Sequence, residues 1–224
     1  MASTEDRLFE AIESDDTTAV RRLLTQDPGV ARARDRHGVS ALMRAVYRSE
    51  QATVDAIREV REDLDVFEAA ALGDRSRLDR LLDADPAVAT SYSADGFTPL
   101  HFAAFFGGPD AVSLLLRRGA EVDAFGRGWM TGTALHSAVS RNHADAVRLL
   151  LDAGANPDAR QSSGWTPLHA AAANGDVATA DLLLAAGADA TATNDEGRTV
   201  MDMAEERGDR ATIERIRSAI QTSP

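Results

Sequence analysis

The 224-residue sequence has no cysteine and no lysine, and only 11 of its residues are Phe, Trp or Tyr. The absence of cysteine excludes disulfides, thiolate metal ligands and thiolate nucleophiles. The absence of lysine excludes the phosphate-binding loop with the pattern GxxxxGK[ST]. No apolar run approaches the roughly 20 residues that a membrane span needs, so we expect no membrane insertion. Because lysine is absent, the strongly basic side chains are all arginine. This bias indicates a high-GC, bacterial genome.

Acidic residues outnumber basic ones, 36 to 24, and the formal net charge is −12. Proteins that bind nucleic acid carry basic stripes, so this balance argues against a nucleic-acid partner. It favours a protein partner with a basic face. The first residues, MASTEDRLFE, lack the basic segment and apolar run of a signal peptide, so we expect a cytoplasmic protein.

One motif occurs four times along the chain from residue 96 onward, as GFTPLHFAA (96–104), GTALHSAV (132–139), GWTPLHAAA (164–172) and GRTVMDMAE (197–205). The first three copies each continue into a Leu triplet and a Gly-Ala pair. With His101, His136, His169 and Asp202 in register, the spacings are 35, 33 and 33 residues. This pattern resembles the ankyrin-repeat family, whose period is about 33 residues.

The resemblance implies an all-α solenoid of about seven stacked helix-turn-helix repeats. Degenerate copies precede the clear ones, with Phe9, Met43 and Phe67 at the position of the histidine. Because a repeat array is one continuous stack, residues 1–224 are predicted to form a single domain. The approximate repeat boundaries are 5–37, 38–62, 63–95, 96–130, 131–163, 164–196 and 197–222.

The spacing from Met43 to Phe67 is only 24 residues, about ten short of a repeat. We therefore predict that the second repeat lacks its finger loop and that a helix near 52–60 leads almost directly into the third repeat. The first and third repeats share an Asp-Pro pair, at 27–28 and 85–86. It should end their outer helices, because proline disfavours helical geometry in the residue before it.

No catalytic or metal-binding pattern stands out in the sequence. His101, His136 and His169 are each separated by a whole repeat, so they are too far apart to share one metal ion. In the family that the chain resembles, these histidines hydrogen-bond backbone and brace the loops. No GxSxG nucleophile motif occurs. We expect neither enzymatic activity nor a metal or other cofactor.

The few aromatic residues are the candidate binding residues. In the resembled family the finger tips, the residue before the TPLH threonine and the end of the inner helix line the concave face. Seven aromatic residues fall at or near such positions: Tyr47, Phe97, Phe105, Phe106, Phe125, Trp129 and Trp165. The alternative is that these rings mainly pack within and between repeats.

The main hypothesis is a monomeric, non-enzymatic module that binds a protein partner through its concave face and finger loops. One alternative is a regulatory, stabilising or inhibitory subunit for an enzyme or effector encoded nearby. Another is an enzyme with a pocket at the irregular junction of the second and third repeats. Such an enzyme would need a deep polar pocket with clustered titratable groups.

Overall fold

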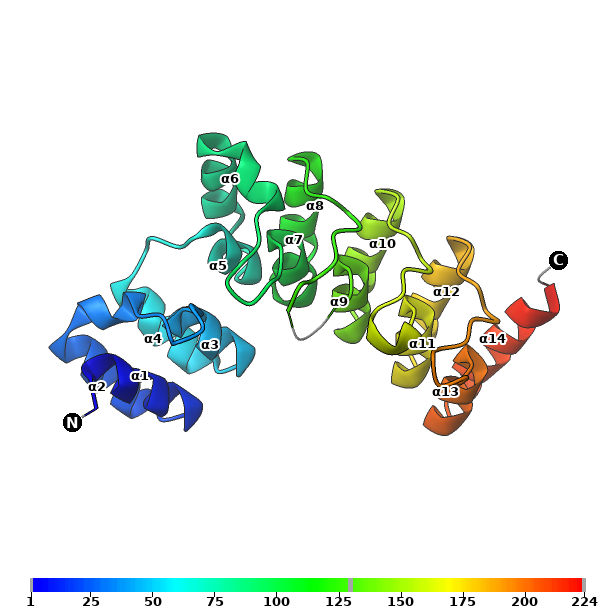
Figure 1. The fold of residues 1–224 in the computed structure, drawn as a ribbon, viewed down its shortest axis with the longest axis horizontal. Helices are drawn as coiled ribbons and strands as arrows, with labels where there is room; N and C mark the ends of the chain where they lie inside the picture. Colours follow the sequence, from blue (N-terminus) through cyan, green and yellow to red (C-terminus); the bar gives the residue numbers. More distant parts are fainter. Residues whose placement is uncertain (1, 129–130, 223–224) are drawn as a thin grey trace. The chain divides into compact units, whose positions relative to one another are not determined.

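The computed structural model describes residues 2–128 and 131–222 as short helices joined by loops (Figure 1). Extended pairing in these residues is confined to two isolated bridges, Arg34–Ser40 and Thr193–Thr199. The all-helical prediction is therefore confirmed. No helix within the described ranges has the length and apolar character that a membrane span requires.

The chain divides into two compact parts, residues 1–68 (the N-terminal part) and 69–224 (the C-terminal part). The division falls within α5 (Val66–Ala71). The single domain and the repeat boundaries remain predictions.

The N-terminal part contains two helix pairs. Its elements are α1 (Thr4–Glu13), α2 (Thr17–Gln26), the 3₁₀ turn η1 (Pro28–Arg32), α3 (Ala41–Tyr47) and α4 (Gln51–Val60). Helix α1 packs on α2 and α3, and α4 packs on the same two helices. Leu8, Ile12, Leu42 and Ile57 are buried between them.

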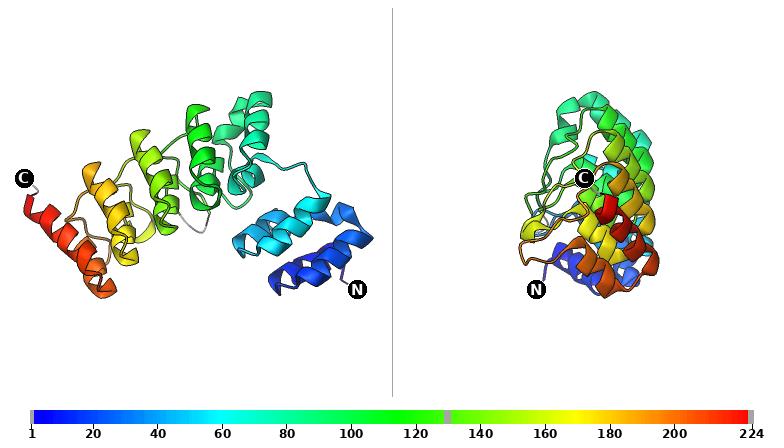
Figure 2. Two further views of the ribbon diagram at one scale, coloured as in Figure 1. Left: turned by 180° about the vertical axis from the view of Figure 1, so that it is seen from behind. Right: turned by 90° about the vertical axis from the view of Figure 1, so that its right-hand side faces the viewer.

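The C-terminal part is a double row of helices (Figures 1 and 2). Packed neighbours in the inner row are α7 (Pro99–Phe102) with the π-helical turn η3 (Ala103–Gly107), α9 (Ala134–Ser140), α11 (Pro167–Asn174) and α13 (Val200–Arg207). The outer row contains α6 (Arg75–Ala84), α8 (Pro109–Arg117), α10 (Ala144–Asp152), α12 (Val177–Ala185) and α14 (Arg210–Thr222). The 3₁₀ turns η2 (Pro86–Thr90) and η4 (Ser162–Gly164) lie in the connections.

The helix ends follow the sequence signals. Pro99 and Pro167 occupy the first helical position, where a missing N–H group costs little. Gly119 follows an outer helix with φ +87°, a left-handed conformation that favours glycine. Asp27 and Asp85 are extended, and they end α2 and α6 immediately before proline. The predicted Asp-Pro stops are confirmed.

The second repeat lacks its finger, as predicted, because only residues 61–65 separate α4 from α5. A buried ion pair lies at this junction. Arg61 donates from Nη1 to Glu68 Oε1 at 2.9 Å and from Nη2 to Glu68 Oε2 at 2.7 Å. Glu68 is 0% exposed and Arg61 6%. The Ser40 hydroxyl donates to Glu68 Oε1 at 2.6 Å, which connects the starts of α3 and α5.

Alignment of the repeats by sequence places Phe67 at the position that histidine occupies in the later repeats. In the structure, Glu68 rather than Phe67 makes the contacts that link neighbouring repeats. Asp65 Oδ1 accepts from the Glu68 N–H, and Glu68 Oε2 accepts from the Asp65 N–H, both at 2.9 Å. This reciprocal pair is a capping box at the start of α5. Asp65 rather than the buried Leu64 therefore caps the helix, one residue later than the alignment of the repeats implies.

Two glycines allow a close backbone approach within the C-terminal part. A Cβ atom on Gly107 would lie 1.9 Å from the carbonyl oxygen of Ala70, and one on Gly73 would lie 2.5 Å from that of Gly107. The inner helix widens here into η3, where the Gly108 N–H donates to Ala103 O at 2.9 Å. No larger residue fits either position without a backbone shift.

Candidate functional site

Two aromatic rings and an arginine meet at the π-helical turn η3. The Phe105 and Phe106 ring centroids are 4.5 Å apart with planes inclined by 58°. The guanidinium of Arg141, at the end of α9, lies 5.2 Å from the Phe105 centroid. Both rings are half-buried and Arg141 is exposed. Such π-turns are frequent at functional sites, and aromatic and arginine side chains dominate binding hot spots.

A second aromatic group lies on the finger loop between α8 and α9. Phe125 is 44% exposed, the highest exposure recorded for a large apolar side chain among the described residues. Its carbonyl oxygen accepts from the Tyr92 hydroxyl at 3.2 Å. Arg127 lies over the Tyr92 ring, 3.6 Å from the centroid, and its N–H donates to Gly96 O at 2.7 Å. The finger is thus tied to the preceding one.

Tyr92 was not among the sequence candidates. The signal that could have identified it is its place one repeat, 33 residues, before Phe125. Trp129, which was a candidate on the same finger, lies outside the described residues.

Phe97 and Trp165 occupy more enclosed positions. Phe97 is 6% exposed, and its ring centroid lies 5.7 Å from that of His101 and 6.0 Å from that of Phe102. Trp165 is half-buried, with its ring 5.8 Å from His169. These contacts favour the packing interpretation for both residues, and a binding role for them remains a prediction. Tyr47 ends α3 in the N-terminal part and is half-buried.

The three motif histidines link neighbouring repeats. The Thr98 N–H donates to His101 Nδ1 at 3.3 Å, so Nδ1 is the acceptor and Nε2 carries the proton. Nε2–H then donates to Gly132 O at 3.0 Å in the next repeat. His136 and His169 repeat this arrangement, donating to Trp165 O and Arg198 O at 3.3 Å. The predicted hydrogen bonds from these side chains to backbone are confirmed.

Burial keeps these histidines neutral. It lowers the pKa of His136 to about 4, although hydrogen bonds to the carbonyls of Trp165 and Ala159 partly oppose the shift. Burial also lowers the pKa of His101 and of His169. Among the described residues, no group of three or more His, Asp or Glu side chains is arranged to hold a metal ion. The geometry of the histidines is that of structural braces.

The repeated helix pairs, the braced loops and the stacked inner and outer rows define an α-helical repeat scaffold. Family models agree: one described as "Ankyrin repeats (3 copies)" matches residues 66–161, and one described as "Ankyrin repeat" matches residues 163–195. Together the two matches cover more than half of the chain. The chain belongs to the ankyrin-repeat family, whose members serve in general as protein-interaction modules.

A curated relative is named "Probable E3 ubiquitin-protein ligase XBOS31", from Oryza sativa subsp. japonica. The two sequences are 45% identical over 67 residues, which are 30% of this chain and 15% of the rice protein. The similarity therefore covers a small part of that relative.

Proposed function

We propose that this chain is a non-enzymatic module that binds a protein partner through the concave face and finger loops of its C-terminal part. The observation that carries the proposal is the Phe105–Phe106–Arg141 group at the π-helical turn. The exposed ring of Phe125 on the neighbouring finger supplies a second apolar contact. Exposed apolar groups rimmed by polar residues are typical of interaction surfaces.

The scaffold favours such binding because its surface is held in place before the partner arrives. Finger contacts such as Tyr92–Phe125 and Arg127–Gly96 fix the loop that carries the exposed ring. Less conformational entropy is then lost on binding. The partner proposed is a protein with a basic face, because the chain carries a net charge of −12.

The test begins with affinity capture from the native organism and identification of the partner by mass spectrometry. Titration then compares Phe106→Ala and Phe125→Ala with the wild type. Each truncation is expected to weaken binding by about 2 kcal/mol, the scale of an interface hot spot, with little change in the unfolding midpoint. Val60→Ala, at an exposed apolar residue of the N-terminal part, is the matched control.

The packing alternative makes the opposite prediction. If the rings mainly stabilise the fold, truncation of Phe106 should cost about 3 kcal/mol or more of stability. Affinity per folded molecule would then be unchanged, and the binding surface would have to be sought elsewhere.

A regulatory or inhibitory subunit is the second candidate function, favoured by the acidic balance of the chain. In that role the acidic surface would cover a basic site on an enzyme or effector. Co-expression with the products of neighbouring genes tests it, because a regulatory subunit would change the activity or solubility of its partner.

A further inference from the structure

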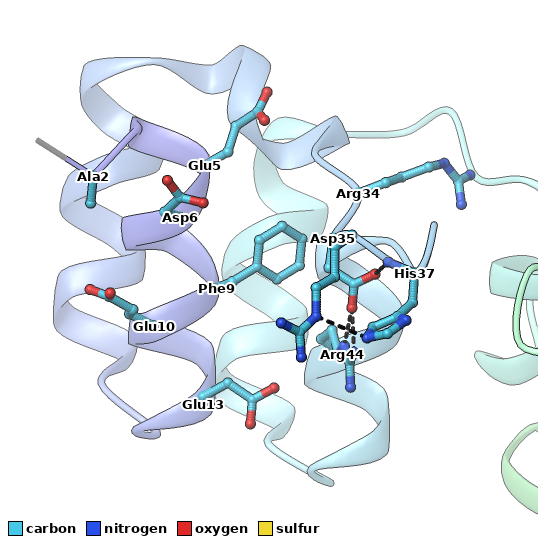
Figure 3. Close-up of a pocket in the computed structure, with 11 residues that line it drawn as sticks. Ala2, Glu5, Asp6, Phe9, Glu10, Glu13, Arg34, Asp35, His37 and Arg44 are labelled. Carbon is cyan, nitrogen blue, oxygen red and sulfur yellow. Dashed lines mark hydrogen bonds and ion pairs between the residues drawn. The ribbon is translucent and has the colours of Figure 1, made fainter. Parts of the chain in front are cut away.

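An open cavity of about 650 Å³ lies in the N-terminal part, beside α1 and the loop that precedes α3 (Figure 3). Helix α1 contributes one wall, which carries Glu5, Asp6, Phe9, Glu10 and Glu13. The loop contributes the opposite wall, and Arg44 of α3 completes the lining. The volume falls within the range of about 300–1,000 Å³ that is usual for ligand sites.

The lining has an excess of negative charge. It contains five carboxylates and three guanidinium groups, which is a formal charge of −2 with His37 neutral. Two of the guanidinium groups are already engaged. Arg44 Nε donates to Asp35 at 2.7 Å, and Arg34 Nη2 donates to Asp65 at 2.9 Å. Arg44 and Asp35 cancel each other within the lining, and Arg34 pairs with a carboxylate outside it. The four carboxylates of α1 therefore face one remaining cation, Arg36, whose Nε donates to His37 Nε2 at 3.0 Å.

Asp35 is committed to the structure of the loop. Burial raises its pKa, but hydrogen bonds from Arg44 and from the backbone of His37 and Val39 outweigh this effect, so the pKa lies below its ordinary value. The carboxylate of Asp6 is committed to capping, since it accepts from the Ser3 N–H at 2.9 Å. Neither group needs a further cation.

Glu5 and Glu13 on α1 remain available beside Phe9, whereas Figure 3 shows Glu10 directed away from the ring. Glu13 has a long contact of 3.6 Å with Arg48, and no described ion pair includes Glu5 or Glu10. Glu5, Phe9 and Glu13 are spaced four residues apart, so they follow one another along the same side of the helix at intervals of about 6 Å. A half-buried aromatic ring thus lies between two exposed carboxylates.

Figure 3 shows the Phe9 ring directed into the cavity from α1. A cation over an aromatic face gains electrostatic attraction from the ring, and nearby carboxylates add ion pairing. The aliphatic stem of an arginine or lysine side chain would also cover apolar surface of the ring. An acidic ligand would gain none of these contacts from α1 and would meet its carboxylates.

We propose that this cavity binds a basic segment of a protein partner, with an arginine or lysine side chain over Phe9 and its charge beside Glu5 and Glu13. The inference rests on the proposed function of the chain as a protein-binding module. It adds a second contact site, in the N-terminal part, and states the chemistry of the residue that the site takes.

The experiment uses the full chain and a capped peptide of alternating glycine and arginine, nine residues long, as the probe. Calorimetric titration compares the wild type with Glu5→Gln/Glu13→Gln. The matched control is Glu121→Gln/Glu196→Gln, which removes the same charge at exposed glutamates of the C-terminal part. We expect the first variant to bind about fivefold more weakly, and the control to bind within twofold of the wild type.

A third variant, Phe9→Leu, separates the ring from the charge. It keeps an apolar side chain of similar size and should weaken binding about threefold through the loss of the cation–π contact. Equal weakening in the two glutamine variants would mean that the overall charge of −12 attracts the peptide, and this would overturn the proposal. So would an absence of measurable binding, or wild-type affinity in Glu5→Gln/Glu13→Gln.

Failure here is distinguishable from failure of the proposed function. Phe125→Ala should bind the arginine peptide like the wild type, because it changes only the site in the C-terminal part. The peptide could fail to bind while Phe106→Ala and Phe125→Ala still weaken binding of the captured partner. In that case the proposal for the cavity is wrong and the proposed function stands.

Discussion

The chain connects neighbouring repeats in two ways. In the C-terminal part, a neutral histidine such as His101 donates to a backbone carbonyl of the next finger. In the N-terminal part, where the finger is missing, the carboxylate of Glu68 receives the Ser40 hydroxyl and both Nη groups of Arg61. A full finger supplies a carbonyl at the right place. Where no finger exists, side chains supply the connection instead.

The two connections should differ in how they fail. Removing a neutral brace leaves a carbonyl without one hydrogen bond. Removing one partner of a buried ion pair leaves an uncompensated charge, which costs considerably more. The ion pair is therefore the more sensitive of the two, although an intact buried ion pair is not necessarily more stabilising.

The largest effect is expected for Glu68→Ala. It leaves the guanidinium of Arg61, which is 6% exposed, without its main carboxylate, and should cost about 3–5 kcal/mol of stability. Urea unfolding followed by far-UV circular dichroism measures the loss. Glu62→Ala, at an exposed glutamate of the same connection, is the control and should change stability by less than about 0.5 kcal/mol.

A double variant sharpens this prediction. Replacing Arg61 and Glu68 together by methionine and leucine removes both charges, so it should recover part of the loss. If the double variant is as unstable as Glu68→Ala, the hydrogen bonds to Ser40 and Asp65, and not the stranded charge, account for the effect.

Acid should weaken the histidine braces. The unfolded chain has an ordinary histidine pKa near 6.5, whereas that of native His136 is about 4, so between these values the unfolded chain binds more protons. The stabilisation that depends on neutral His136 is complete above pH 6.5, and it is lost as the pH falls toward 4. For His136 this amounts to roughly 3 kcal/mol.

Urea unfolding at several pH values between 7 and 4 tests this prediction. His136→Gln should show a shallower dependence on pH than the wild type, because one of the shifted groups is gone. Identical slopes for the two proteins would rule out His136 as a source of the acid sensitivity.

A smaller loss, about 1–3 kcal/mol each, is expected for His101→Ala and His169→Ala, because each removes a buried hydrogen bond between repeats. Partner binding should persist at temperatures where the fold survives. The free energy of unfolding and the affinity for the partner, measured on the same samples, test both expectations. Stoichiometric zinc binding that disappears in these variants would contradict the structural role.

The smallest effect is expected at the surface of the outer row. Arg118 Nη1 contacts Asp83 at 2.6 Å, and Arg118 also pairs with Asp79. Exposed ion pairs contribute little, so Arg118→Ala should cost less than about 1 kcal/mol. Thermal unfolding at low and high salt measures the contribution, which should decrease as salt screens the charges.

The sequence predicted the features that depend on local chemistry. The Thr-Pro starts, the glycine stops and the Asp-Pro ends act within a few residues, so they are readable without the structure. The missing finger could also be predicted, because it is a matter of chain length: 24 residues from Met43 to Phe67 cannot form a whole repeat.

Other features depend on contacts between distant residues. Asp65 caps helix α5 because Glu68 contacts Arg61 and Ser40, and the spacing of the repeats in the sequence does not reveal these contacts. The enclosure of Phe97 by His101 and Phe102 could not be separated in advance from exposure on the concave face. The pairing of Arg127 with Tyr92 and the cavity beside Phe9 likewise require the folded loops.

The close approach of Gly73 and Gly107 bears on how this array can evolve or be rebuilt. Repeats are often treated as interchangeable cassettes, but here the neighbouring turns that carry these glycines fit only because both positions lack a side chain. A grafted repeat that carries a residue larger than glycine at either position would bring a Cβ atom into the backbone of its neighbour. Any replacement of either turn must therefore keep glycine at both contact positions.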